Sequence, residues 1–179
     1  MVLFKNKLWL IGGALSSGKS NQAPTKFLND IWSSDDGINW KAEHSSAPWP
    51  PMDNIKVIVF KDQLWMISGA GRNSVWKSAD GKTWTLVADK VPWKERRGNG
   101  VQVFNNLIWV FGGYEMNDVW FSADGVRWQQ LNEHAPWSPR GTEYSISFKN
   151  KIWLFSGKTG KEDSWAGDIW VLLHQTNEH

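Results

Sequence analysis

Short runs of apolar residues recur along this chain at a constant interval, and glycine-containing turns separate them. The runs align on Trp65, Trp109 and Trp153, which follow one another in steps of 44 and 44 residues. Each run is apolar at consecutive positions, as in Ile108-Trp109-Val110-Phe111, which indicates a strand buried on both faces. A constant period in the forties built from such strands is typical of radially repeated four-stranded sheets. The pattern predicts an all-β fold, a β-propeller of four-stranded antiparallel blades.

Each repeat is expected to contain two hairpins. The first crosses a polar two-residue turn such as Asn105-Asn106, and the second crosses an Asp-Gly turn such as Asp124-Gly125. Asp-Gly between two strand-like runs is a strong hairpin signal. The loop to the next repeat carries Pro-Trp, as at Pro136-Trp137, where proline ends strand pairing. We expect a single array over residues 1–179 with about four blades, approximately at 2–49, 55–93, 99–137 and 143–173.

Two irregularities interrupt this regular pattern. The loops between the second and third strands are longer in the first and fourth repeats than in the third. After Trp170 only nine residues remain, without an Asp-Gly hairpin, so we expect the last blade to lack its outer strand. A propeller ring must close or leave a sheet edge unpaired. The chain is therefore expected to continue into further blades of a larger ring, or to complete a ring as a homo-oligomer.

The composition adds few constraints on function. Of the 15 Trp residues, 14 occupy four repeating positions, and a residue repeated in every blade is best explained by packing. A net charge of +2 gives no argument for a nucleic-acid partner. No apolar run is long enough to cross a bilayer, and no targeting segment precedes the repeats. The absence of Cys excludes disulfides and thiolate chemistry but leaves the compartment undecided.

The repeats differ from one another most after each Pro-Trp. Because strand direction alternates, the loop that enters the first strand and the loop that leaves the second lie on one face of the propeller. Variable loops on a rigid scaffold are where ligand contacts are expected. We therefore predict a ligand-binding face formed by Asp53, Arg96, Arg97, Asn99, Arg140, Glu143 and Trp165.

Two interpretations are open for these residues. The three arginines are suited to forked pairing with a ligand carboxylate, or they neutralise nearby acidic residues as solvated pairs. Trp165, in the inserted loop 158–167, either stacks on a sugar or anchors a peptide, or it packs under its own loop. The four His residues show no ligand spacing and no phosphate loop is present, so we expect no metal and no cofactor.

The double glycine Gly112-Gly113, the aromatic residue on the third strand and the Trp on the fourth resemble the Kelch repeat of β-propellers. The resemblance covers essentially the whole chain, although Ser68-Gly69 and Ser156-Gly157 depart from the double glycine. It implies a propeller without defining the chemistry, since the family includes protein-binding modules, a copper oxidase of galactose and sugar-acid mutarotases. Oxidase chemistry of that kind needs a Cys-crosslinked Tyr and is excluded by the absence of Cys.

The Ser-x-Asp-Gly-x-x-Trp turns resemble the Asp-box of sialidases, with one residue fewer. A sialidase site needs a Tyr nucleophile helped by a carboxylate. Glu143 would point to the opposite side of the strand from Tyr144, so glycoside hydrolysis is not expected.

The sequence favours a non-catalytic Kelch-type propeller that binds a protein, peptide or glycan partner, with no role for nucleic acid or membrane. The alternative from another class is an enzyme resembling the sugar-acid mutarotases. In that case Arg96 or Arg140 would bind the substrate carboxylate and Glu143 would transfer a proton, which requires a raised pKa at Glu143. A third alternative is a structural fragment of a larger propeller.

Overall fold

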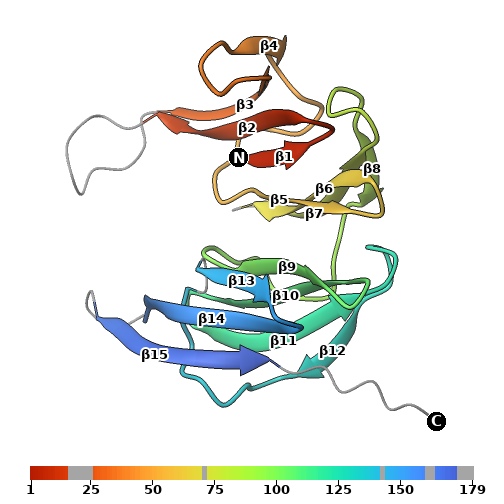
Figure 1. Cartoon of the computed structure of the whole chain (residues 1–179). Helices are drawn as coiled ribbons and strands as arrows, with labels where there is room; N and C mark the ends of the chain where they lie inside the picture. Colours follow the sequence, from red (N-terminus) through yellow and green to blue (C-terminus); the bar gives the residue numbers. More distant parts are fainter. Residues whose placement is uncertain (16–25, 70–71, 142–143, 160–163, 173–179) are drawn as a thin grey trace. The chain divides into compact units, whose positions relative to one another are not determined.

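The computed structural model describes residues 1–15, 26–69, 72–141, 144–159 and 164–172 (Figure 1). These residues form four antiparallel sheets, which we call blades 1 to 4 in chain order. Blade 1 contains β1 (Val2–Phe4), β2 (Lys7–Leu15), β3 (Lys26–Ser34) and β4 (Lys41–His44), and blade 2 contains β5 (Lys56–Phe60), β6 (Gln63–Gly69), β7 (Arg72–Ser78) and β8 (Thr85–Ala88). Blade 3 contains β9 (Gly100–Phe104), β10 (Leu107–Gly113), β11 (Met116–Ser122) and β12 (Gln129–Asn132), and blade 4 contains β13 (Ser145–Phe148), β14 (Lys151–Lys158) and β15 (Trp165–Leu172).

The predicted fold class is confirmed, because every sheet is antiparallel with its strands in chain order and the fourth has three strands. The chain divides into two compact units, one of residues 1–95 with blades 1 and 2, the other of residues 96–179 with blades 3 and 4. No helix in the described part of the chain is long and apolar enough to cross a membrane.

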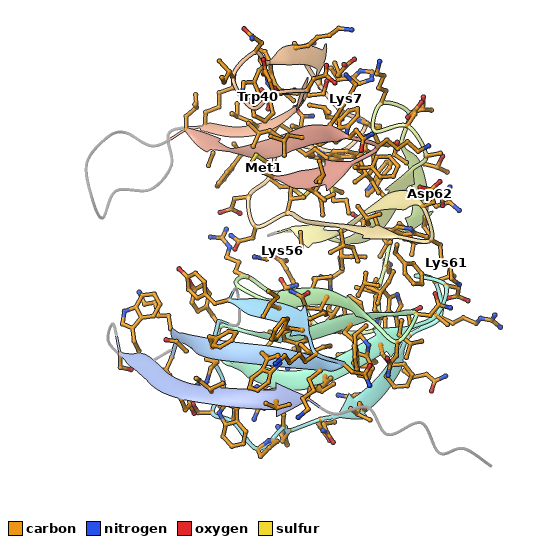
Figure 2. All side chains as sticks on the ribbon, in the orientation of Figure 1. Met1, Lys7, Trp40, Lys56, Lys61 and Asp62 are labelled. Carbon is orange, nitrogen blue, oxygen red and sulfur yellow. The ribbon has the colours of Figure 1, made fainter. Side chains whose placement is uncertain are left out.

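The first hairpin of each blade turns on two residues with left-handed backbone. Lys61 and Asp62, labelled in Figure 2, have φ angles of 48° and 54°, and Asn105 and Asn106 have 50° and 54°. Two consecutive positive φ angles define a turn whose twist matches that of the flanking strands. The Trp of the second strand then ties the hairpin together, as its indole N–H donates to the carbonyl of the Phe that ends the first strand, at 3.0 Å for Trp109 and Phe104.

The Asp-Gly turn of each second hairpin is held by its own side chains. In blade 3 the carboxylate of Asp124 accepts from the backbone N–H groups of Val126 and Arg127 at 2.9 and 2.8 Å, and the hydroxyl of Ser122 accepts from Gly125 N–H at 2.8 Å. Hydrogen bonds from the backbone, that of Arg127 foremost, hold the pKa of Asp124 well below its usual range. The turn is a structural unit, as the sequence predicted.

The core of each unit lies between its two blades. In the first unit Trp9 and Ile31 of blade 1 pack in one cluster with Leu64 and Met66 of blade 2. In the second unit the cluster joins blade 3 to blade 4 through residues at the same repeat positions, namely Trp109, Phe111 and Val119 with Ile152 and Leu154. One face of each apolar strand therefore packs on the opposite face of the strand in the next blade.

The departure from the double glycine at Ser156-Gly157 does not change the turn. Ser156 adopts a φ of 54°, the same as Gly12 at the equivalent position of blade 1. A non-glycine residue in this region costs about 1–2 kcal/mol, so blade 4 keeps the turn geometry at some expense in stability.

Candidate functional site

The guanidinium of Arg96 is buried inside blade 3, at the end of the loop that precedes β9. It donates to the two carboxylate oxygens of Asp118 on β11 at 2.7 and 2.9 Å, and to the carbonyl of Gly112 at 2.9 Å. The Arg96 side chain is fully buried, and that of Asp118 is 17% exposed. The indole N–H of Trp120 donates to the same carboxylate at 2.7 Å. This forked ion pair fixes the loop to the second and third strands of its blade.

Two opposing effects act on the pKa of Asp118. Burial raises it, but the hydrogen bonds from Arg96 and Trp120 and the positive charge of Arg96 outweigh burial, so the pKa lies below its ordinary value of 3.8. A carboxyl whose pKa is depressed in the folded state stabilises the protein above the unfolded-state pKa. This contribution is lost as the pH falls through the folded-state pKa.

We predict that Asp118→Asn weakens the acid dependence of stability. Between about pH 5 and pH 2 the unfolding midpoint in urea should fall more steeply for the wild type than for Asp118→Asn, because the variant has no carboxyl to protonate at this position. Urea titrations at several pH values measure both slopes. Equal slopes would show that the ion pair does not contribute to acid unfolding.

Blade 4 repeats the ion pair with Arg140. Its guanidinium donates to both oxygens of Asp168 on β15, and also to the carbonyl and the hydroxyl of Ser138 at 3.0 and 2.6 Å. Hydrogen bonds from Arg140, followed by that from Trp170, lower the pKa of Asp168 against a smaller opposing effect of burial. Arg140 is 4% exposed. Two of the three arginines of the predicted binding face, Arg96 and Arg140, therefore have their charge neutralised inside a blade.

Blades 1 and 2 show how the pair varies. In blade 2 the arginine position is occupied by Met52, which is buried in the core of the first unit, and the aspartate position by Ser74. The hydroxyl of Ser74 accepts from the indole of Trp76 at 3.2 Å. In blade 1 the aspartate is present as Asp30 and accepts from Trp32 at 2.8 Å, but no cation pairs with it among the described residues.

The other predicted site residues have different environments. Arg97 is exposed and its carbonyl accepts from Tyr114 N–H at 3.0 Å, so it lies at the same turn as Arg96. The carbonyl of Arg140 accepts from Gly113 N–H at 3.0 Å, which brings the three arginines around the turn 112–114. The amide side chain of Asn99 is fully buried, with no partner for it in the described part of the chain.

Three predicted residues remain. Trp165 begins β15 and is 61% exposed, and Asp53 in the first unit is half-buried. Glu143 lies outside the described residues. The ligand-binding role of the set stays a prediction.

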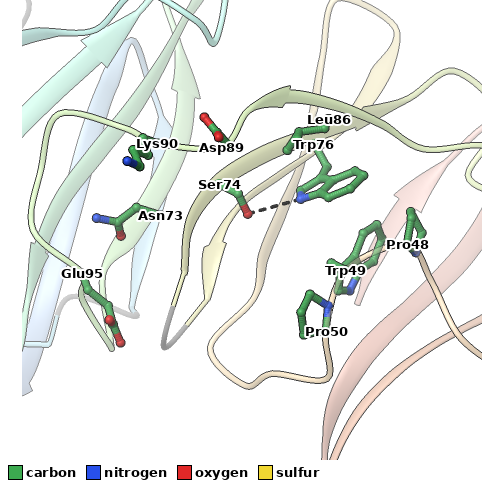
Figure 3. A pocket seen from close by; sticks show the side chains of 10 residues that line it. All are labelled: Pro48, Trp49, Pro50, Asn73, Ser74, Trp76, Leu86, Asp89, Lys90 and Glu95. Carbon is green, nitrogen blue, oxygen red and sulfur yellow. Dashed lines mark hydrogen bonds between the residues drawn. The ribbon is translucent and has the colours of Figure 1, made fainter.

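A pocket of about 430 Å³ opens in the first unit, at a place that the sequence did not single out. It lies between the loop after β4, the strands β7 and β8, and the loop after β8 (Figure 3). Its apolar lining comes from the loop and strand side chains Pro48, Trp49, Pro50, Trp76 and Leu86, and its polar lining from Asn73, Ser74, Asp89, Lys90 and Glu95. The rings of Trp49 and Trp76 meet edge to face at 5.5 Å, which stiffens the apolar wall.

The loop after β8, which contributes to the pocket, differs from the corresponding loops of the other blades. In blades 1 and 3 the corresponding loop places a buried alanine against the third strand, as Ala47 N–H donates to Asn29 and Ala135 N–H to Asn117, at 2.8 and 2.9 Å. In blade 2 this position is Val91, which is half-buried, and no equivalent bond joins it to Asn73 within the described chain. The loop after β8 therefore makes one backbone hydrogen bond fewer to the third strand than the loops of blades 1 and 3.

The side chain of Asn73 makes fewer hydrogen bonds to its loop than the side chain of Asn117 in blade 3. Its side-chain N–H donates to the carbonyl of Trp93 at 2.6 Å, whereas Asn117 donates to two loop carbonyls, at 2.8 and 2.9 Å. The side-chain oxygen of Asn73 is buried and accepts no hydrogen bond from the described residues. A buried acceptor without a donor costs about 1–3 kcal/mol, so the pocket wall is incompletely satisfied.

The sequence does contain signals for this pocket in retrospect. Val91 stands where the other loops have Ala47 and Ala135, and Ser74 stands where the other blades have Asp. Both differences fall in blade 2. No group of three or more His, Cys, Asp or Glu that could hold a metal ion lies in the described parts of the chain.

The four antiparallel sheets, each with its strands in chain order, define a β-propeller built from repeated blades. Comparison with solved structures supports this class, with matches to 144 chains. One of them, the structure of YjhT, matches with a TM-score of 0.68 and 14% sequence identity, over 87% of this chain and 57% of that chain. At this identity the match shows the fold alone, and our chain spans little more than half the length of the matched one. No protein-family model and no curated protein sequence matches the chain.

Proposed function

We propose that the protein is a non-catalytic β-propeller module that binds a short peptide segment of a protein partner in the pocket of the first unit. The observation that carries this proposal is an open pocket of about 430 Å³ with an apolar wall and charged residues at its edge. Ligand sites commonly have volumes of roughly 300–1,000 Å³ and combine apolar lining with a few polar groups.

The chemistry of the lining favours a peptide over a glycan. Pro48, Pro50 and Leu86 are exposed, and they offer aliphatic surface that can bury an apolar side chain. Asp89, Lys90 and Glu95 bring both signs of charge to the edge of the pocket, which suits the mixed polarity of a peptide. A sugar would need an open aromatic face, whereas of the two Trp residues in the lining Trp49 is only 2% exposed and Trp76 is half-buried with its ring against Trp49.

Two of the three predicted arginines give no support to a ligand carboxylate site, since Asp118 and Asp168 already occupy the guanidinium groups of Arg96 and Arg140. The same pairs give no support to a mutarotase mechanism, in which one of these arginines would bind the substrate. Binding without catalysis is therefore the function that the described residues support best.

We predict that Leu86→Asp reduces peptide affinity at least about tenfold, because it places a charge on the apolar wall. Peptide arrays select a ligand for the wild-type chain, and fluorescence titration then compares the variants. Lys90→Glu should change the charge preference of the selected peptides.

The matched control is Leu131→Asp, whose side chain is 42% exposed against 45% for Leu86 and lies outside the pocket. It should leave affinity unchanged. Equal affinity of Leu86→Asp and wild type would exclude the pocket. Loss of binding in Trp165→Ala alone, or a ligand found only on a glycan array, would transfer the site to the second unit or the ligand to another class.

A further inference from the structure

Blade 4 carries an apolar face that no other strand of its unit covers in the described chain. Strand register places Lys151 and six apolar residues on this side of the sheet: Ile146, Phe148, Trp153, Phe155, Ile169 and Val171. The ammonium groups of Lys149 and Lys151 lie over the rings of Phe148 and Trp153 at 5.5 and 5.9 Å, at the margin of this face. Phe155 is 38% exposed and Ile169 is 60% exposed. Their counterparts in blade 3, Phe111 and Val119, are completely buried against the following blade. We call this surface the blade 4 face.

Blade 1 carries a second uncovered apolar face, on the opposite side of its sheet. Register pairs Leu3 with Leu8 and Leu10 with Trp32, and these four residues share that side. Leu10 is 44% exposed, whereas Met66 at the same position of blade 2 is completely buried. We call this surface the blade 1 face.

These two faces correspond to the two sides of a packing interface between neighbouring blades, and this interface, which we call the joint, is present within each unit. In the first unit the Trp9 and Ile31 side of blade 1 packs on the Leu64 and Met66 side of blade 2. The blade 4 face occupies the positions of the first half and the blade 1 face those of the second. Each face therefore carries apolar residues at the repeat positions that pack against the other face inside a unit.

We propose that a second copy of this chain supplies the missing neighbour, so that the blade 4 face of one copy packs on the blade 1 face of the other. Large contiguous apolar surfaces are uncommon on monomeric proteins and mark interaction sites. A contact between unlike faces is heterologous, and such contacts form a closed ring whose smallest version has two copies. The proposal commits to a second copy because one chain presents both halves of the joint.

Solution mass tests this proposal on the full chain. Size exclusion with light scattering should give about twice the monomer mass of 20.5 kDa. Ile169→Asp and Leu10→Asp should each reduce the mass to that of the monomer, because each places a charge in the joint. The control is Ile38→Asp, at an 81% exposed turn position outside both faces, which should leave the mass unchanged.

Mixing the two variants tests which faces meet. A Leu10→Asp copy keeps an intact blade 4 face and an Ile169→Asp copy keeps an intact blade 1 face, so the mixture should recover a dimer that neither variant forms alone. Circular dichroism confirms that each variant is folded, as expected for substitutions at exposed positions. A wild-type monomer, a dimer insensitive to both substitutions, or a mixture that stays monomeric would each overturn the proposal.

Discussion

Arg96→Met should lower the free energy of unfolding by about 3 kcal/mol, because it leaves the carboxylate of Asp118 partly buried without its counter-charge. Removing one partner of a buried pair costs about 3–5 kcal/mol, and the partial exposure of Asp118 places the expected value at the lower end. The carbonyl of Gly112 also loses its donor. Urea denaturation followed by tryptophan fluorescence measures the change.

The double variant Arg96→Met/Asp118→Ser should recover most of this loss. It copies the uncharged pair that blade 2 carries at Met52 and Ser74, and replacing both members of a buried ion pair is often close to neutral. Arg127→Met is the control, since Arg127 pairs with Asp124 at a side chain that is 91% exposed and surface pairs contribute about 0–1 kcal/mol. An Arg96→Met variant as stable as the control would show that the buried pair does not hold the loop.

Gly157→Ala should destabilise the protein more than Gly13→Ala, although the two glycines hold the same repeat position. Both have left-handed backbone, with φ of 137° and 127°, so an alanine costs about 1–3 kcal/mol at either. At Gly157 the added Cβ would also lie 2.2 Å from the carbonyl oxygen of Gly141, whereas at Gly13 no atom of the described residues lies within 4 Å. The clash should add about 1–3 kcal/mol.

Thermal or chemical denaturation of the two variants gives this difference directly. The cost of placing an alanine at a positive φ angle is common to both variants. The difference between them therefore measures the steric contact between the turn and the loop that precedes blade 4. Equal losses in both variants would mean that the loop moves away from Gly157 without cost.

The sequence predicted the parts of the fold that depend on neighbouring residues. The turn at Asn105-Asn106 and the turn at Asp124-Gly125 are decided by local backbone and side-chain chemistry, so their hairpins could be placed in advance. The three-stranded last sheet was also predicted, because no Asp-Gly hairpin follows Trp170.

The environment of the predicted arginines could not be read in the same way. Arg96 and Asp118 are 22 residues apart, and the sequence offered closer acidic residues as partners, among them Glu95. Only the fold brings the end of a loop against the middle of the third strand. A comparison of repeats could have found the pair, because Met52 and Ser74 depart from the charged pattern together.

The pocket lies beside a small difference between repeats. Val91 exceeds the alanines of the neighbouring loops by two methyl groups, and no backbone hydrogen bond joins it to Asn73 within the described chain. Periodicity identifies the loop but does not measure how closely it packs, because packing responds to single methyl groups. The substitutions at Val91 and Ser74 mark blade 2 as different, but the sequence alone does not show that a pocket forms there.

The arginine of each ion pair comes before its blade, while the aspartate lies within it. A gene duplication that copied only the segment from first strand to fourth strand would deliver an aspartate without its arginine. A module that begins at the Pro-Trp loop would carry Trp93 and Arg96 together with blade 3 and would keep the pair complete. Recombination that adds or removes a module keeps the pairing intact only where its breakpoints lie ahead of that loop.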